Sequence, residues 1–269
     1  MMFYAADYRR LARENLRGNW WLSIAVVFMA TLLGGTVGGT SFFIKIPETL
    51  LPLIKEHVPG LIPLAALSPI ILSGLFLVQI ILGGAVALGN AQYHLNQYDK
   101  KPLTFKTLFS KFDQFGASLC LNLLTGLYSI LWGLVPMIIG FIIGLLLDLM
   151  NPWYGLLLVI VFLIPFAVAC YSYSMSFYIM TEYPEMGANK AIRASRDLMR
   201  GRKWELFCLT FSFIGWHILT MLTLGIGNLF LGPYISSAYA AFYRQIKSPR
   251  EINGLQHATV SPEERNLSL

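Results

Sequence analysis

Few residues in this chain have the types and spacing that catalysis or metal binding requires. Its four histidines are scattered, and none pairs with a second histidine at metal-ligand spacing: His57, His94, His217 and His257. No H-E-x-x-H, G-x-S-x-G or Walker motif occurs. The cysteines lie in apolar segments without C-x-x-C spacing: Cys120, Cys170 and Cys208. We therefore expect no catalytic residues, no metal site and no cofactor, and a protein that is not an enzyme.

Neutral polar side chains within the apolar runs are the remaining candidates for a site. Three of them suit the lining of a polar cavity: Asn90, Asn122 and His217. Hydrogen bonding between helices, at about 0.6 to 2 kcal/mol each, is the alternative interpretation. The acidic residues Asp148, Glu182 and Glu205 all fall at the ends of apolar runs. Because ion-coupled transporters usually hold an ionisable group near the bilayer centre, this pattern argues against ion-coupled transport.

The composition indicates that these residues belong to a membrane protein. Of 269 residues, 56% are hydrophobic and 13% charged, and the mean hydropathy is +0.60. A soluble domain of this size cannot bury so much apolar surface, whereas helices in lipid need only satisfy their own backbone. Six stretches are predicted to cross the membrane: 22–43, 69–93, 117–146, 153–180, 206–224 and 229–246. Whether the stretch after Asn228 is a separate sixth crossing depends on which side of the membrane the basic residues lie.

Lysine and arginine residues are concentrated between these stretches. Only Lys45 and Lys55 lie outside four basic clusters, which fall at 9–17, 100–111, 190–203 and 244–265. Basic loops stay on the cytoplasmic side, so the last apolar stretch must cross twice to keep Arg244 on the side of Arg200. We therefore predict six crossings with both termini cytoplasmic. The net charge of +6 then indicates attraction to anionic headgroups rather than nucleic-acid binding.

An internal repeat is the next feature, with units at about 4–93, 103–180 and 188–246. Each unit begins with a short basic amphipathic segment and continues as a predicted transmembrane hairpin. In the second unit, Thr104 is a plausible N-cap, and the apolar residues that follow have helical spacing: Phe105, Leu108, Phe109 and Phe112. The first and third units share an Arg-Gly-x-x-Trp entry, at Gly18 and Gly201.

These entries predict a bend between an in-plane helix and a membrane-spanning one. Glycine tolerates the backbone geometry of such a bend, so we expect it at Gly18 and Gly201. Trp21 and Trp204 are then expected at headgroup depth. Pro233 is expected near the outer end of the last crossing, where its missing N–H costs little.

Part of the chain resembles a known family. The segment from Ser195-Arg196-Asp197-Leu198 through Phe211-Ser212-Phe213 to Ala240-Ala241-Phe242-Tyr243 is similar to the domain-of-unknown-function 975 family of bacterial integral membrane proteins. The basic opening from Arg9 to Trp21 resembles that family's opening too. The resemblance covers about residues 5–246. It implies a bacterial multi-pass membrane protein of unestablished function and brings no catalytic residues.

Together these features predict an all-α polytopic membrane protein. Residues 1–249 are expected to form a single six-span domain of three hairpins, each preceded by a cytoplasmic interfacial amphipathic helix, and 250–269 a polar cytoplasmic tail. We expect a non-enzymatic inner-membrane protein that binds anionic lipid, a partner membrane protein or a second copy of itself. The candidate headgroup-binding residues are Arg193, Arg196, Arg200 and Lys203. The alternative is a transporter or exporter of a lipid-like or small neutral solute.

Overall fold

The computed structural model describes residues 5–35, 62–146, 152–223 and 227–247, and every regular element within these ranges is helical. The predicted tail at 250–269 and the outer segment at 44–61 lie outside the described residues. The all-α prediction is confirmed for the described part of the chain. Two stretches, Phe105–Leu146 and Trp153–Glu182, are long and apolar enough to cross a membrane.

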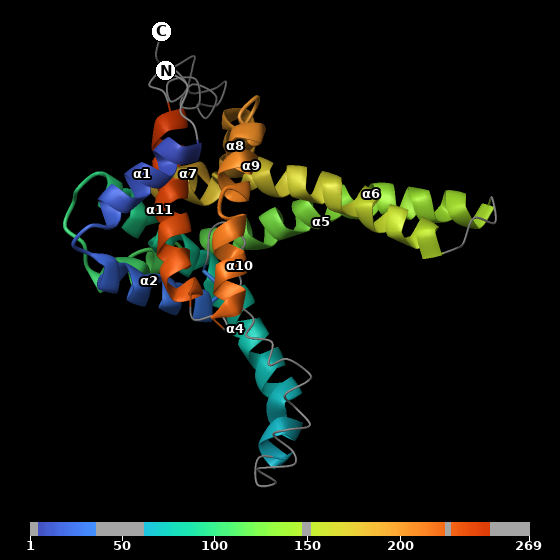
Figure 1. Ribbon diagram of the computed structural model, residues 1–269, viewed down its shortest axis with the longest axis horizontal. Coiled ribbons are helices and arrows are strands. Elements are labelled where there is room, and N and C mark those ends of the chain that lie inside the picture. Colours follow the sequence, from blue (N-terminus) through green and yellow to red (C-terminus); the bar gives the residue numbers. More distant parts are fainter. Residues whose placement is uncertain (1–4, 36–61, 147–151, 224–226, 248–269) are drawn as a thin grey trace.

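The core is built around the last helix, α11 (Asn228–Ile246), in which every residue from Leu231 to Tyr243 is buried. α1 (Ala5–Leu16) and α2 (Trp20–Leu32) pack on one side of it. On the other side are α9 (Lys203–Phe211) and α10 (Ile214–Leu222), as Figure 1 shows. The carboxyl-terminal part of α4 (Ile62–Tyr98) also packs against α11. The body is therefore a helical bundle, and α11 is its central, buried helix.

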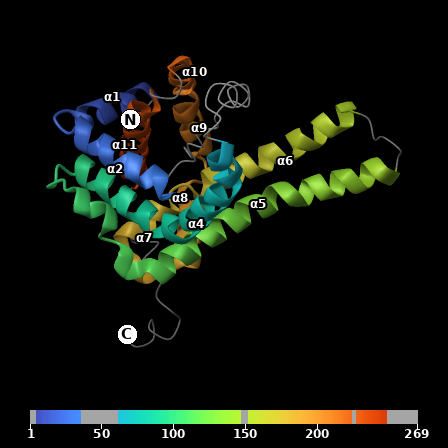
Figure 2. The same cartoon turned by 90° about the horizontal axis from the view of Figure 1, so that it is seen from below.

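A long helical hairpin leaves this body. α5 (Phe115–Leu146) and α6 (Pro152–Tyr173) pack side by side and project outward, across the direction of α11 in Figure 1 and again clear of the body in Figure 2. Their apolar side chains are largely exposed, as at Leu131, Ile139 and Leu157, which are each about half exposed. So large an apolar surface marks contact with lipid or protein. Pro136 lies inside α5 and Pro165 inside α6, and both helices continue past their proline.

Several predicted crossings have different boundaries in the structure. In the first predicted crossing, α2 ends at Leu32, and Gly34 follows in a left-handed conformation, with φ +78°. The fourth stretch divides into α6 and α7 (Ser176–Glu182), and the fifth into α9 and α10. At both divisions a serine hydroxyl donates to a carbonyl three residues earlier: Ser174 to Tyr171 at 2.8 Å, and Ser212 to Leu209 at 2.6 Å. Such bonds compete with the helical ladder and bend or end helices.

The three basic segments also differ from one another. α1 and α8 (Ala188–Leu198) are amphipathic α-helices. The second segment is not the single helix that its spacing predicts. It forms two 3-10 turns, η2 (Phe105–Phe109) and η3 (Phe112–Gln114), and the Thr104 side chain makes no capping hydrogen bond. The cause is tertiary: Leu108 is fully buried, and its carbonyl group approaches Gly89 of α4 so closely that a side chain at Gly89 would collide with it.

α1 is packed against the body, and its expected in-plane position in a membrane stays a prediction. It packs alongside α11, with Tyr8 against Phe242 at a ring-centroid distance of 5.3 Å. At the other end of α11, the Trp21 ring lies 6.4 Å from that of Phe230. The apolar face of α1 (Tyr8, Ala12 and Leu16) is therefore used for packing inside the protein.

Candidate functional site

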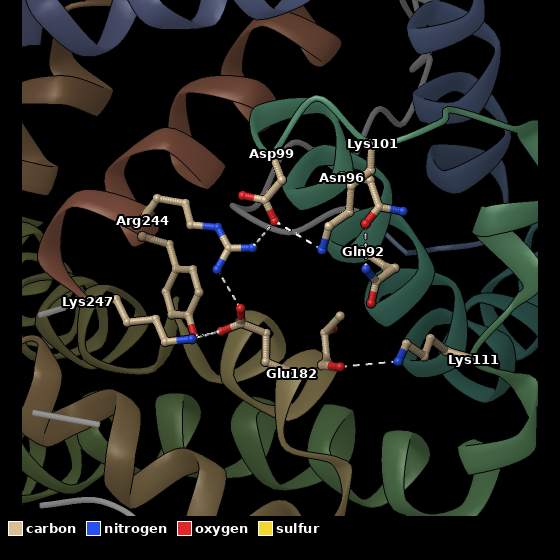
Figure 3. Close-up of polar contacts among 10 residues, drawn as sticks. Gln92, Asn96, Asp99, Lys101, Lys111, Glu182, Arg244 and Lys247 are labelled. Atoms are coloured by element: carbon tan, nitrogen blue, oxygen red, sulfur yellow. Dashed lines mark hydrogen bonds and ion pairs between the residues drawn. The ribbon is translucent and has the colours of Figure 1, made fainter. Parts of the chain in front are cut away.

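Charged side chains at or just after the ends of the three predicted repeat units meet in one cluster, which Figure 3 shows. Asp99 follows α4, Glu182 ends α7, and Arg244 and Lys247 lie at the end of α11. The Arg244 guanidinium donates to Glu182 Oε1 and to Asp99 Oδ2, each at 2.5 Å. Lys247 Nζ donates to Glu182 Oε2. We call these four residues the exit cluster.

The exit cluster is mostly shielded from solvent, since none of its side chains is more than 23% exposed. Tyr243 donates its hydroxyl to Glu182 Oε2 at 2.5 Å, and its ring stacks on Tyr178 at 5.3 Å. Within the cluster two carboxylates face two cations, and the exposed Lys101 approaches Asp99 Oδ2 at 3.5 Å as a third cation. Because each carboxylate accepts from a cation of another segment, the arrangement joins helices and leaves no activated group for chemistry.

From the sequence, Arg244 and Lys247 indicate only membrane topology, Glu182 is noted only as an acidic residue at the end of an apolar run, and Asp99 carries no prediction. The available signal was that the three units end alike, in an aromatic residue followed by a polar stretch and a proline. A second charge of the predicted basic loops is also used internally: Lys111 Nζ donates to the Thr181 carbonyl oxygen at 3.1 Å. Arg244 and Glu182 are more than 60 residues apart in sequence. Their contact can be recognised only in the tertiary structure.

The three residues expected to line a polar cavity lie on three helices. Asn90 of α4 is buried, and its Oδ1 atom has no hydrogen-bond partner. Asn122 of α5 donates to the Ile80 carbonyl oxygen at 3.3 Å, so it joins α5 to α4. His217 is half-buried on α10. Neither of the two hollows described below is lined by any of them, and a shared cavity stays a prediction.

A buried polar chain runs along α4 instead. Tyr93 and Gln97 both contact the Ser23 hydroxyl of α2, at 3.0 and 3.1 Å. Gln97 is also hydrogen-bonded to His94, at 3.1 Å from Nδ1. These contacts are interhelical or within one helix, which matches the packing interpretation of neutral polar residues in membrane helices.

The candidate headgroup-binding residues lie on and just after α8. One face of that helix is buried, including Ala191, Ile192 and Leu198. The side chains of Arg193, Arg196 and Arg200 are exposed, and Lys203 is half-buried at the start of α9. Asp197 lies 4.0 Å from Arg196 and 3.2 Å from Arg200. Since surface ion pairs of this kind are weak, the face keeps its basic character.

Gly18 and Gly201 are both left-handed glycines between separate helices, whereas a bend from an in-plane to a membrane-spanning helix stays a prediction. Gly18, with φ +83°, lies between α1 and α2, and Gly201, with φ +75°, lies between α8 and α9. The tryptophans that follow are both exposed, Trp21 by 79% and Trp204 by 72%. They lie towards opposite ends of α11, because Trp21 contacts Phe230 whereas Glu205, next to Trp204, bonds to the Tyr8 hydroxyl beside Phe242. If α11 crosses a membrane, the two tryptophans cannot share one headgroup level.

Pro233 lies inside α11 and is buried, one turn beyond the helix start at Asn228. The helix continues through it. Pro233 therefore lies near the start of α11, and its place at the outer end of a membrane crossing stays a prediction.

Two surface hollows lie in the described part of the chain. One, of about 550 Å³, is almost wholly apolar and lies on the hairpin between Tyr128, Trp132, Pro136 and Pro165. The other, of about 400 Å³, is lined by arginines of α1 and by Trp20. Among the described residues, no three His, Cys, Asp or Glu side chains gather as a metal site would need.

Comparison with known proteins identifies one family. The family model described as "Protein of unknown function (DUF975)" matches residues 2–250. No curated protein and no solved structure matches the chain.

Proposed function

We propose that this chain, which belongs to the DUF975 family of proteins of unknown function, is a non-enzymatic multi-pass membrane protein that binds anionic lipid. The observation that carries the proposal is the position of the basic helix α8 at the base of the apolar α5–α6 hairpin. Tyr128 of α5 donates to Asn189 of α8 at 3.4 Å. Ser195 of α8 donates to the Ser172 carbonyl oxygen, in the last turn of α6, at 2.8 Å.

The length of the exposed hairpin supports this placement. From Tyr128 to Leu146, α5 rises about 27 Å at 1.5 Å per residue. This is close to the roughly 30 Å thickness of a hydrocarbon core. Tyr128, Trp132 and Tyr173 lie at the base, with Trp132 donating to the Tyr173 hydroxyl at 3.1 Å. Aromatic residues favour the membrane interface, so a hairpin inserted to this depth brings the arginines of α8 to the headgroups.

The six crossings stay a prediction, because α11 lies across the direction of the α5–α6 hairpin in Figure 1 and two perpendicular elements cannot both cross one flat bilayer. The exit cluster supports the placement of the ends of α4, α7 and α11 on one side of the membrane. Asp99 and Glu182 follow the second and fourth predicted crossings, and Arg244 lies at the end of the sixth. An even number of crossings separates them, so all three must lie on one side of the membrane, and they are in contact. Placing that side in the cytoplasm follows from the basic loops, and a bacterial inner membrane from the family resemblance.

The proposal is tested by lipid analysis of the protein extracted in native nanodiscs. Each exposed arginine near the surface contributes about 1 kcal/mol of attraction to an anionic membrane. We expect enrichment of anionic lipid around the wild type and its loss in the triple variant Arg193→Gln, Arg196→Gln, Arg200→Gln. The matched control replaces the same arginines by lysine, which keeps the charge and should keep the enrichment. Equal lipid composition in the wild type and the glutamine variant would refute the proposal.

A further inference from the structure

The turn between α1 and α2 encloses a hollow of about 400 Å³ lined by Arg10, Arg13, Glu14, Arg17 and Trp20, which we call the elbow pocket. Arg10 and Arg13 share one face of α1, because they are three residues apart, and Arg17 follows directly after the helix end at Leu16. The opposite face, with Tyr8, Ala12 and Leu16, is buried against the body. Packing thus holds the arginine face outward.

Gly18 sets the chain direction that brings Trp20 to the elbow pocket. Its left-handed conformation turns the chain so that α2 begins at Trp20, only four residues after α1 ends at Leu16. A side chain at Gly18 would meet no atom within 4 Å, so it is the backbone conformation that calls for glycine here. The half-buried Trp20 indole then faces the arginines as an apolar wall.

The elbow pocket has an excess of positive charge. It contains three guanidinium groups and one carboxylate, and that carboxylate, Glu14, pairs with Arg10 at 3.8 Å. Within the described part of the chain, neither Arg13 nor Arg17 is paired with a carboxylate. Both side chains line the pocket and are exposed to solvent. Two guanidinium groups one turn apart without an acidic partner suit a multiply oxygenated anion.

We propose that the elbow pocket binds a phosphate group, with Arg13 and Arg17 as the principal donors. A guanidinium group binds phosphate through two parallel charge-assisted hydrogen bonds. The volume lies within the range of small-molecule sites and accommodates a group of headgroup size. The phosphate is that of a soluble ligand or of a phospholipid headgroup. In the second case the exposed Trp21 and Phe230 rings, 6.4 Å apart, offer apolar surface beside the pocket.

The phospholipid form of this inference rests on the proposed membrane function. The phosphate site itself does not, because none of its residues belongs to α8. The two proposals can therefore fail separately: loss of lipid enrichment in the α8 variants leaves the elbow pocket untouched.

The test uses the full-length protein in a neutral detergent and three probes: inorganic phosphate, short-chain phosphatidylglycerol, and phosphatidylcholine with the same chains. Native mass spectrometry and calorimetry count bound probe and measure affinity. We expect one saturable phosphatidylglycerol site that excludes phosphatidylcholine. Competition by inorganic phosphate at equal affinity assigns a soluble source, and its failure to compete assigns a lipid headgroup.

Variants tie the binding to the pocket. The double variant Arg13→Gln, Arg17→Gln should weaken binding by about 10-fold or more, as expected for two lost charged hydrogen-bond donors. Arg13→Lys, Arg17→Lys keeps the charge without the paired donors and should fall between. The control Lys100→Gln, Lys106→Gln removes the same charge from exposed residues outside both proposed sites and should leave the pocket's affinity unchanged. Wild-type affinity in the Arg13 and Arg17 double glutamine variant, an equal loss in the control, or no saturable binding of any anionic probe would overturn the inference.

Discussion

Glu182 and Arg244 are 62 residues apart in sequence and form an ion pair of 2.5 Å between the ends of α7 and α11. Arg244 holds Asp99 with its second terminal nitrogen, so one guanidinium group joins the ends of three helices. Because the side chains of Glu182 and Arg244 are only 18% and 19% exposed, removal of either partner leaves a poorly solvated charge. The exit cluster therefore links three helices, and its loss should lower the stability of the whole body.

Glu182→Gln should destabilise the protein by about 3 kcal/mol, because both Arg244 and Lys247 lose their shared carboxylate. The measurement is the unfolding free energy in detergent. The matched control is Asp197→Asn, which breaks the exposed pairs of α8 and should cost less than about 1 kcal/mol. Equal stability of Glu182→Gln and the wild type would show that the exit cluster does not join the helices.

Gly201→Ala should cost about 1 to 2 kcal/mol, because φ is +75° there and an L-residue is strained in the left-handed region. Space is not the cause, since an added Cβ would meet nothing within 4 Å. Gly215→Ala on α10 has the same open surroundings without the positive φ and serves as the control. A thermal unfolding midpoint as high for Gly201→Ala as for the control would exclude a strained bend.

Gly89→Ala should cost about 3 kcal/mol or more, because the added methyl group would collide with the Leu108 backbone carbonyl. The backbone of η2 would have to move to relieve the contact. Gly126→Ala on α5, with no atom within 4 Å of the added carbon, should leave stability unchanged or raise it slightly. Expression and unfolding of the two variants would be compared. Comparable stability of both would mean that α4 and η2 are farther apart than the structure shows.

Tyr8→Phe should destabilise by about 1 to 2 kcal/mol, since it removes the 2.7 Å hydrogen bond to Glu205 that links α1 to α9. Burial and then this hydrogen bond raise the pKa of the Tyr8 hydroxyl far above its usual range, so it remains a donor at neutral pH. Proteolysis in native membranes reports the effect: we expect earlier cleavage at the arginines of α1. An unchanged cleavage pattern would indicate that α1 is held by its apolar face alone.

Cysteine labelling tests the membrane orientation. Leu50→Cys should react with an impermeant reagent from outside, whereas Lys106→Cys and Arg193→Cys should not. Ser195 is unsuitable as a labelling position because it is fully buried and hydrogen-bonded to the Ser172 carbonyl group. Cys120 and Cys170 are exposed, so they must first be replaced. The reverse labelling pattern would invert the proposed topology.

The helical class, the apolar hairpin and the amphipathic faces of α1 and α8 could be predicted from the sequence, because they depend on local periodicity and on runs of apolar residues. The helix breaks at Gly18 and Gly201 belong to the same group, since glycine next to a basic helix end is a local signal. The family could also be recognised from short segments such as 195–198 and 240–243.

Other features were decided only by tertiary contacts. The η2 and η3 turns replace a predicted helix because Leu108 packs against Gly89 of α4. α1 packs against α11 because its apolar face contacts Phe242. The helical spacing in the sequence does not show which partner that face has. The exit cluster likewise depends on bringing Asp99, Glu182 and Arg244 together over long sequence separations. A sequence pattern determines which face of a helix is apolar, whereas the partner of that face is chosen by packing of the whole chain.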